Sequence, residues 1–302
     1  MVRRTWHIRR PWRTASSGLA FLLTATMASS ALASGPGGRQ ELATRGGSAV
    51  SLRAGHRTPF VIAHRGASRY APENTLAAID AAHRRGLVWV ENDVQRTKDG
   101  QLVVMHDTTL NRTTDAAKVF PHRAPWRVGD FTAAEIARLD AGSWFGGRFA
   151  GERVPTLAAY LRRLDRNRQG LLLELKAPER YPGIEAQTLR ELRARGWLDG
   201  AHLSRRLVIQ SFSVRCVRRV HSLAPQVRTG ILGHPPLSAL RSYARFADEI
   251  NPRMSQVDSR WAQAVHRLRG PHGRRLEIYA WDVAADAGVQ TVRTRPVEGV
   301  ID

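Results

Sequence analysis

The stretch of sequence that decides the fold is FVIAHRGASRYAPENTLAAIDAAHRRGLVWVENDVQRTKDGQLVVMHD, from Phe60 to Asp107. Apolar runs at 60–63 and 88–94 predict two strands, and the amphipathic pattern at 74–85 predicts a helix between them. A strand, a helix and a second strand in this order are typical of a parallel sheet.

The same alternation continues to the end of the chain. Further strands are predicted at 171–176, 207–211, 228–232, 249–252, 277–283 and 299–301. Further helices are predicted at 184–196, 213–223, 235–246, 258–269 and 284–294. Eight strands alternating with helices favour a closed (β/α)8 TIM barrel over an open, doubly wound sheet. No Gly-x-Gly-x-x-Gly pattern follows the first strand, which counts against a dinucleotide-binding fold.

The second predicted strand is followed by a hairpin instead of a helix. Asp99-Gly100 is a tight-turn signal, and the apolar run at 102–106 comes too soon after it for a crossover helix. We therefore expect 102–106 to be an antiparallel strand that is not one of the eight barrel strands. Residues 108–153 then form a small insertion after the second barrel strand, with one short helix predicted at 133–139.

The N-terminal segment has the pattern of a secretory signal peptide. Five arginines precede an uncharged apolar stretch at 18–27, and an A-x-A cleavage site ends at Ala33. The apolar stretch is shorter than the roughly 20 residues of a transmembrane helix. Gly-rich, polar residues at 34–58 predict a linker. We expect a signal peptide at 1–33, a barrel domain at 59–302, and a secreted protein without stable membrane insertion after cleavage.

The chain carries 47 basic and 26 acidic residues, a formal net charge of +21. Such a charge is typical of proteins that bind nucleic acid or another polyanion. Here only three basic residues are lysines, and the arginines are spread along the whole chain, as in proteins from GC-rich genomes. We therefore expect no nucleic-acid partner. Cys216 is the single cysteine, which excludes an internal disulfide and a cysteine-rich metal site.

Acidic residues gather at the carboxyl ends of the predicted strands, where the active sites of such barrels lie. Glu91 and Asp93 are two apart and leave one face of their strand, and Glu174 ends the next barrel strand. A salt bridge would explain any one pair. Three carboxylates at one barrel mouth repel each other unless a cation is bound, and oxygen ligands favour Ca²⁺ or Mg²⁺ over zinc.

Two histidines, His64 and His106, are placed at predicted strand ends. A pair of imidazoles supplies the proton donor and acceptor that displacement at phosphorus needs near neutral pH. The guanidinium of Arg65 can donate two hydrogen bonds to phosphate oxygens, and Lys176 adds a positive charge. Beside a metal ion, these residues predict metal-assisted cleavage of a phosphodiester.

Short motifs follow one another in a specific order from 60 to 302. They are His64-Arg65-Gly66, Pro72-Glu73-Asn74-Thr75, Glu91-x-Asp93-Val94, Thr97-Lys98-Asp99-Gly100, His106-Asp107, Arg112-Thr113-Thr114, Leu139-Asp140-Ala141-Gly142-Ser143-Trp144-Phe145, Val154-Pro155-Thr156-Leu157, Glu174-Leu175-Lys176, Ser211-Phe212 and Gly299-Val300-Ile301-Asp302. In this order they resemble the glycerophosphodiester phosphodiesterase family, over essentially all of 60–302.

The resemblance implies a TIM barrel with a small insertion after the second strand. It implies that His64 and His106 are the acid/base pair, and that Glu91, Asp93 and Glu174 hold one divalent cation, Ca²⁺ or Mg²⁺. It also implies the reaction, which is hydrolysis of a small-molecule glycerophosphodiester to sn-glycerol 3-phosphate and an alcohol.

Other residues take their expected roles from the same resemblance. Arg65 and Lys176 would face the phosphate, and Trp281 would line the substrate site or pack in the barrel. Glu73 and Asn74 would order the loop after the first strand, with Asn74 as the N-cap of the first helix.

Three features depart from the family's pattern. Asn92 stands in place of an apolar residue and should point to the helix layer. Asp282 stands in place of a threonine and could change which head group is accepted. The sequence ends at Asp302, where relatives usually continue into an eighth helix, so either 36–58 or a segment beyond this sequence would cover that flank.

Two other functions fit parts of the pattern. A related barrel lipase, of the sphingomyelinase D-like or lysophospholipase D-like kind, would use the same histidines and metal on lysophospholipids. It would need an apolar groove, and the aromatic residues of the insertion would form either that groove or the insertion's own small core; they are Phe131, Trp144, Phe145 and Phe149. A non-catalytic barrel that captures anionic polymers would not need two histidines beside three carboxylates.

Overall fold

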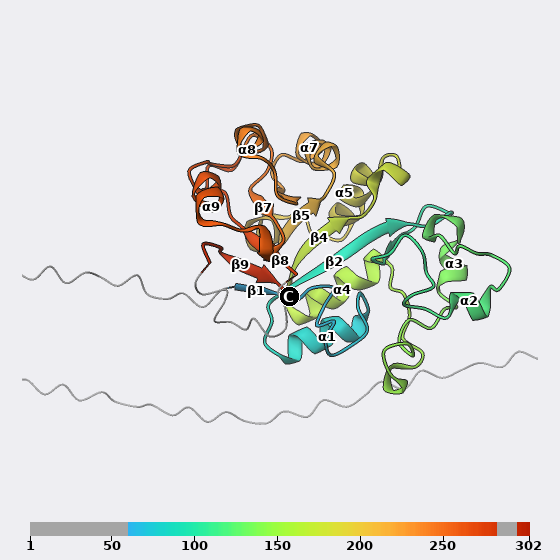
Figure 1. Ribbon diagram of the computed structural model, residues 1–302. Helices are drawn as coiled ribbons and strands as arrows, with labels where there is room; N and C mark the ends of the chain where they lie inside the picture. Colours follow the sequence, from blue (N-terminus) through green and yellow to red (C-terminus); the bar gives the residue numbers. More distant parts are fainter. Residues whose placement is uncertain (1–59, 283–294) are drawn as a thin grey trace, which may run out of the picture. The chain divides into compact units, whose positions relative to one another are not determined.

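A barrel of eight parallel strands forms the centre of the protein in the computed structural model, which describes residues 60–282 and 295–302 (Figure 1). The strands are β1 Phe60–Ile62, β2 Trp89–Arg96, β4 Gly170–Leu175, β5 Leu207–Ser211, β6 Arg228–Leu232, β7 Glu249–Asn251, β8 Tyr279–Trp281 and β9 Gly299–Ile301. Every residue of β4 and β5 is buried, as expected for parallel strands that are covered on both faces.

Backbone pairing closes these strands into a barrel. Parallel ladders join β2, β4, β5, β6 and β7 in that order, and a second set joins β1, β9 and β8. Isolated parallel bridges close the two remaining gaps, Ala63 with Val90 next to β1 and Glu249 with Glu277 next to β8. The predicted closed (β/α)8 barrel is therefore confirmed.

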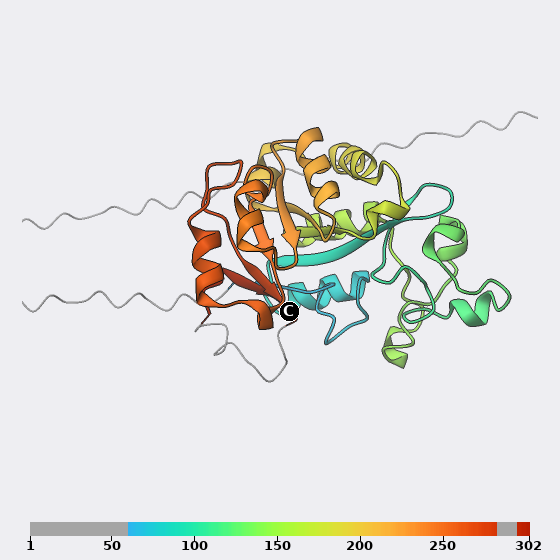
Figure 2. The same cartoon turned by 45° about the horizontal axis from the view of Figure 1, so that its top comes forward.

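Helices pack on the outside of the barrel and connect most of its strands (Figures 1 and 2). They are α1 Leu76–Arg84, α4 Leu157–Asn167, α5 Ile184–Ala194, α6 Gly200–Arg205, α7 Val214–Leu223, α8 Leu237–Tyr243 and α9 Ser259–His266. Within 60–282 and 295–302, no helix is long and apolar enough to cross a membrane. The helix predicted at 284–294, the signal peptide and the linker lie outside the described residues.

Helix α4 belongs to the second β/α unit and was not among the predicted helices. Thr156 caps it by accepting a hydrogen bond from Ala159 N. Four of its residues have the i, i+3, i+4, i+7 spacing of a buried helix face, and all are fully buried: Leu157, Tyr160, Leu161 and Leu164. The spacing is visible in the sequence, directly after the insertion.

The insertion lies to one side of the barrel, beyond the carboxyl end of β2 (Figures 1 and 2). Strand β3, Leu102–Val104, pairs antiparallel with β2 as predicted. After it come the short segments α2 Ala116–Val119, η1 Val128–Asp130, α3 Ala133–Ile136 and η2 Gly147–Phe149, so the helix predicted at 133–139 is shorter than expected. Phe131, Leu110 and Leu139 are buried with β3 in a small core of the insertion's own.

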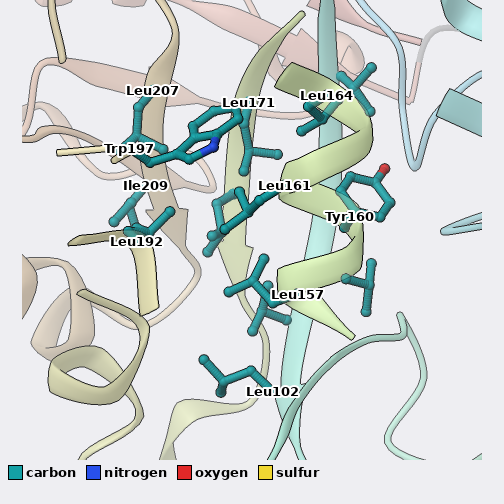
Figure 3. Close-up of a cluster of buried hydrophobic side chains, with 14 of the residues drawn as sticks. Leu102, Leu157, Tyr160, Leu161, Leu164, Leu171, Leu192, Trp197, Leu207 and Ile209 are labelled. Carbon is teal, nitrogen blue, oxygen red and sulfur yellow. The ribbon is translucent and has the colours of Figure 1, made fainter. Parts of the chain in front are cut away.

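The largest apolar cluster lies between the barrel wall and the helices α4 and α5 (Figure 3). Leu161 of α4 and Leu171 of β4 are fully buried in it. Trp197, which follows α5, is also fully buried, and its indole N–H donates to Asp165 Oδ2 at 2.9 Å. The missed helix therefore covers a large part of the barrel wall.

Truncating this cluster should measure how much α4 contributes to stability. Leu161→Ala should lower the free energy of unfolding by about 2–5 kcal/mol, because the substitution leaves a cavity in a closely packed core. Arg162→Ala, on the exposed face of the same helix, should change it by less than about 0.5 kcal/mol. Urea denaturation followed by circular dichroism measures both, and equal effects would contradict this packing.

Candidate active site

A pocket of about 380 Å³ opens at the carboxyl end of the barrel strands. It is lined by all the predicted site residues except Asp93 and by several others: His64, Arg65, Glu91, His106, Glu174, Lys176, Gln210, Phe212, Leu232, Arg253, Trp281, Asp282 and Ile301. Asp93 is buried beside the lining, next to Lys176 and Arg65. The fold thus brings the predicted residues together.

Three carboxylates meet in this pocket because β2 and β4 are neighbours in register. Glu91 and Asp93 leave the same face of β2, and Asp93 is paired with Glu174 of β4. One oxygen of each lies within 4.8 Å of the others, and all three residues are buried. Asn92, between them in sequence, is fully buried on the opposite face, as expected.

Burial and mutual repulsion control the ionisation of these carboxylates. Burial, followed by the Asp93 charge, raises the pKa of Glu174 to about 8. The same two causes raise the pKa of Glu91 well above its usual range. Burial acts on Asp93 as well, but nearby cations, with Lys176 first, outweigh it and hold the pKa of Asp93 below its usual value. The cluster therefore lacks positive charge, which a divalent cation would provide.

Lys176 provides part of the missing positive charge. Its Nζ is 3.0 Å from Glu174 Oε1 and 3.4 Å from Asp93 Oδ1. Burial alone would lower the pKa of Lys176, but the Asp93 and Glu174 carboxylates outweigh burial and raise it. The ammonium therefore stays charged where it lines the pocket.

Arg65 is positioned by a tight turn after β1. Arg65 has φ 54° and Gly66 has φ 79°, and a Cβ on Gly66 would lie 2.5 Å from a side-chain carbon of α1, so only glycine fits there. In this turn the backbone N–H of Arg65 donates a hydrogen bond to Glu91 Oε2 at 2.8 Å. Arg65 Nε is buried 3.8 Å from Asp93 Oδ2 and has no hydrogen-bond partner among the described residues.

Asn74 does not cap the first helix, so that prediction was wrong. The N-cap is Thr75, whose side chain accepts from Ala78 N. Asn74 has φ 59° and donates from Nδ2 to Asp93 Oδ2 at 2.8 Å. Asparagine adopts this left-handed conformation more readily than most residues, which lets the loop turn its amide towards the carboxylate. Asn74 therefore orients a predicted metal ligand.

A continuous chain of charged contacts runs from His106 to Arg65. His106 Nδ1 is 2.7 Å from Asp107 Oδ1. Arg112, from the insertion, donates to Asp107 through Nε (2.6 Å) and to Glu73 through Nη1 and Nη2 (3.0 and 2.8 Å). Glu73 also accepts from Arg65 Nη1 at 3.0 Å. Asp107 and Arg112 were expected only as parts of motifs, without a role in positioning the histidine or the arginine.

The two histidines differ in how readily they take up a proton. Burial, with the Arg65 charge next, lowers the pKa of His64 to about 4. Burial also lowers the pKa of His106, while the Asp93 charge and, more weakly, the hydrogen bond to Asp107 act in the opposite direction. The pKa of Asp107 is held far below its usual range, first by the hydrogen bond from Arg112, so Asp107 is ionised and His106 Nδ1 donates to it.

Two aromatic side chains, Phe212 and Trp281, form part of the remaining wall of the pocket. The Trp281 ring packs edge-on against Phe212 with ring centres 5.8 Å apart, and its indole N–H donates to Asn251 O at 2.9 Å. Trp281 therefore both lines the pocket and packs against the barrel. Asp282 also lines the pocket, and its Oδ2 is 3.5 Å from Arg253 Nη1. Phe212 and Arg253 had not been predicted as pocket residues.

The aromatic residues of the insertion do not line this pocket. Phe131 is buried in the insertion's own core, and Phe149 packs against the main core. Trp144 is 43% exposed and contacts Phe145, which in turn contacts Phe149. An acyl-chain groove built from these residues therefore has no counterpart at the described pocket.

The carboxylate cluster should make the metal-free protein less stable as the pH rises from about 6.5 to 8. With a folded pKa of about 8 against an ordinary 4.5, Glu174 holds a proton that the unfolded chain has already lost. The opposite contribution of His64 ends near its ordinary pKa of 6.5. Thermal midpoints in EDTA should therefore fall across this interval, and Ca²⁺ or Mg²⁺ should cancel the fall. Glu174→Gln removes the titrating carboxyl group and is the matched control, so its thermal midpoint should fall less steeply with pH. A thermal midpoint of the parent protein that rises with pH in EDTA would contradict the prediction.

Known proteins share this architecture. Residues 64–302 match the Glycerophosphoryl diester phosphodiesterase family. The chain is 36% identical over 248 residues, 80% of its length, to Bacillus subtilis YhdW, provisionally named a glycerophosphodiester phosphodiesterase, of which it covers 93%. Two crystal structures are similar. The glycerophosphodiester phosphodiesterase of Agrobacterium tumefaciens has a TM-score of 0.63, 32% identity, and coverage of 80% of this chain and 95% of that one. An Oleispira antarctica phosphodiesterase in complex with the product sn-glycerol-3-phosphate has a TM-score of 0.64, 28% identity, and coverage of 81% and 92%. The chain belongs to the glycerophosphoryl diester phosphodiesterase family.

Proposed function

We propose that this enzyme hydrolyses glycerophosphodiesters to sn-glycerol 3-phosphate and an alcohol, using one divalent cation and two histidines. The observation that carries the proposal is one pocket lined by both histidines, by two carboxylates of the acidic cluster and by two cations, Arg65 and Lys176. A phosphodiester is an anion that repels nucleophiles, so cleavage needs positive charge around its oxygens. The two cations are placed to contact those oxygens.

The acidic cluster is suited to hold the divalent cation. Its members, Glu91, Asp93 and Glu174, offer buried carboxylate oxygens within 4.8 Å of one another and no sulfur or nitrogen ligand. That donor set favours Ca²⁺ or Mg²⁺ over zinc. When bound, the cation supplies positive charge that stabilises the transition state of a phosphodiester.

The two histidines are suited to different steps. His64, with a pKa of about 4, is neutral at pH 7 and can accept a proton from the nucleophile, which is water or the substrate's neighbouring hydroxyl. His106 has an ionised carboxylate, Asp107, on Nδ1, which stabilises the imidazolium and leaves Nε2 to protonate the leaving alcohol. In-line displacement needs the base and the acid on opposite sides of phosphorus.

The substrate assignment is supported by the relative from Oleispira antarctica, whose structure contains sn-glycerol-3-phosphate. The insertion aromatics, which could have formed an acyl groove for a lysophospholipid, do not line the described pocket. Phe212 and Trp281 offer apolar ring surface beside the candidate site, against which the carbon atoms of a glycerol unit or a small alcohol could pack.

A comparison of two substrates tests this function directly. We expect turnover of glycerophosphocholine, little turnover of lysophosphatidylcholine, and loss of activity in a chelator with recovery on adding Ca²⁺ or Mg²⁺. Equally efficient turnover of lysophosphatidylcholine would replace the proposal with a lipase activity. Binding of both compounds without turnover of either would indicate a binding barrel.

Substitution of each histidine should separate the two proton transfers. His64→Ala and His106→Ala should each lower kcat about 10²–10⁴-fold, while KM changes less because Arg65 and Lys176 still contact the phosphate. Each substitution should remove one limb of a bell-shaped pH–rate profile. A substrate with a p-nitrophenolate leaving group should partly rescue only His106→Ala, because that group leaves without a proton. Rescue of His64→Ala instead would reverse the assignment, and near-normal turnover in both variants would refute it.

Export to the cell exterior is also part of the proposal, and it is supported by the sequence pattern of residues 1–33. Expression of the full chain in a bacterial host should yield a mature protein that begins at Ser34, because Ala33 ends the cleavage site. N-terminal sequencing of the protein in the culture medium measures this. A protein that stays in the cells and keeps Met1 would contradict export.

A further inference from the structure

A second pocket, of about 290 Å³, carries a strong excess of positive charge. It is formed by the end of β2, the turn before β3, the η1 segment of the insertion and the loop after β4. Four cations line it, and one carboxylate, Asp130, opposes them; the cations are Arg96, Lys98, Arg127 and Arg180. Nothing in the proposed reaction uses these residues.

The protein leaves most of this charge without a counter-ion. In the part of the chain that the structure describes, Lys98 and Arg180 form no ion pair. Arg127 approaches Asp130 only to 3.9 Å, and both side chains are more than half exposed. Arg96 donates to a backbone carbonyl at 3.1 Å and lies over the Tyr181 ring. Four cations around one hollow, opposed by a single carboxylate, create a site for an anion.

We propose that this second pocket binds a phosphate group. A guanidinium group can donate two parallel hydrogen bonds to phosphate oxygens, and the Lys98 ammonium adds a positive charge on a flexible side chain. A pocket of this volume has room for a phosphate with a small organic substituent. The ligand class is therefore inorganic phosphate, a phosphomonoester or a phosphodiester.

The position of the pocket connects it to the catalytic centre through two loops. The loop after β3 contributes His106 to the first pocket and Thr108 to the second. The loop after β4 contributes Lys176 to the first and Arg180 to the second. An anion held in the second pocket therefore contacts the same two loops that position a catalytic histidine and a phosphate-binding lysine.

A buried hydrogen-bond relay strengthens this connection. Tyr181, which lines the second pocket and is 6% exposed, donates from its hydroxyl to Gln95 Oε1 at 3.0 Å. Gln95 Nε2 donates to the carbonyl oxygens of Met105 and Asp107, at 2.7 Å each. These carbonyls flank His106, so the wall of the second pocket and the histidine loop are held by the same side chain.

Two sources could provide the phosphate. One is a second phosphate of a substrate that contains more than one phosphodiester, bound while the first is cleaved. The other is free phosphate or a phosphomonoester, which would act on the rate from outside the catalytic pocket. The first source rests on the proposed function, whereas phosphate binding by itself does not.

Calorimetric titration of the full-length, Mg²⁺-loaded protein with inorganic phosphate tests the site. The double variant Lys98→Ala/Arg180→Ala should weaken one class of binding sites at least about tenfold, or about 1.4 kcal/mol. The control Arg190→Ala/Arg193→Ala removes the same charge from the exposed face of α5 and should bind as the parent does. Circular dichroism confirms that all variants fold. Equal phosphate binding by the two double variants would overturn the proposal, since general surface charge would then explain the binding.

Kinetics with two substrates identify the source. In the first case, the second phosphate of a substrate occupies the pocket. Lys98→Ala/Arg180→Ala should then raise KM about tenfold for a glycerophosphodiester that carries two phosphodiester groups, and should leave KM for glycerophosphocholine unchanged. If free phosphate occupies it, added phosphate should change kcat for glycerophosphocholine in the parent and not in the variant. A parent inactive on glycerophosphocholine would refute the proposed function, while the phosphate titration would still decide whether the second site exists.

Discussion

Repulsion among three buried carboxylates is the constraint on which the rest of the site depends. Glu91 and Asp93 are fixed by the alternation of β2, and Glu174 is fixed by the register between β2 and β4, so no carboxylate can move away while the barrel stays closed. The protein relieves the repulsion only in part, through Lys176 and Arg65. Burial, followed by the remaining repulsion, raises the pKa of the two glutamates. A cation bound among the carboxylates would relieve that repulsion.

The insertion contributes to the site by positioning residues, and not by covering the pocket with aromatic side chains. Arg112 contacts Glu73 in the first β/α loop and Asp107 in the loop after β3. These two carboxylates hold Arg65 and His106, respectively. One guanidinium therefore links Arg65 and His106, which lie in the loops after two different strands, and such supporting contacts are what a catalytic geometry requires.

The barrel and the clustering of the candidate site residues could be predicted from the sequence, because both depend on patterns that repeat within a few residues. Apolar runs marked the strands, and the two-residue spacing of Glu91 and Asp93 placed them on one face. The role of Asn74 could not be predicted, because it depends on a positive φ and on a contact with Asp93, 19 residues away. The contact of Arg112 with Glu73 spans 39 residues and has no local signal. Helix α4 was predictable from its spacing and was nonetheless missed.

A second acidic group in the same barrel, Glu249 and Glu277, contrasts with the first in its partners. At the amino ends of the strands, Arg228 Nη2 donates to Glu249 Oε1 at 3.1 Å and to Glu277 Oε2 at 2.6 Å. Tyr279 donates its hydroxyl to Glu277, so the protein's own donors satisfy this group. At the carboxyl ends, Glu91 accepts one backbone N–H and faces two further carboxylates across the pocket wall. Pairing with the protein's own donors at the amino ends favours stability, whereas the carboxylates at the carboxyl ends keep a deficit of positive charge, which is the property that a site for a divalent cation requires.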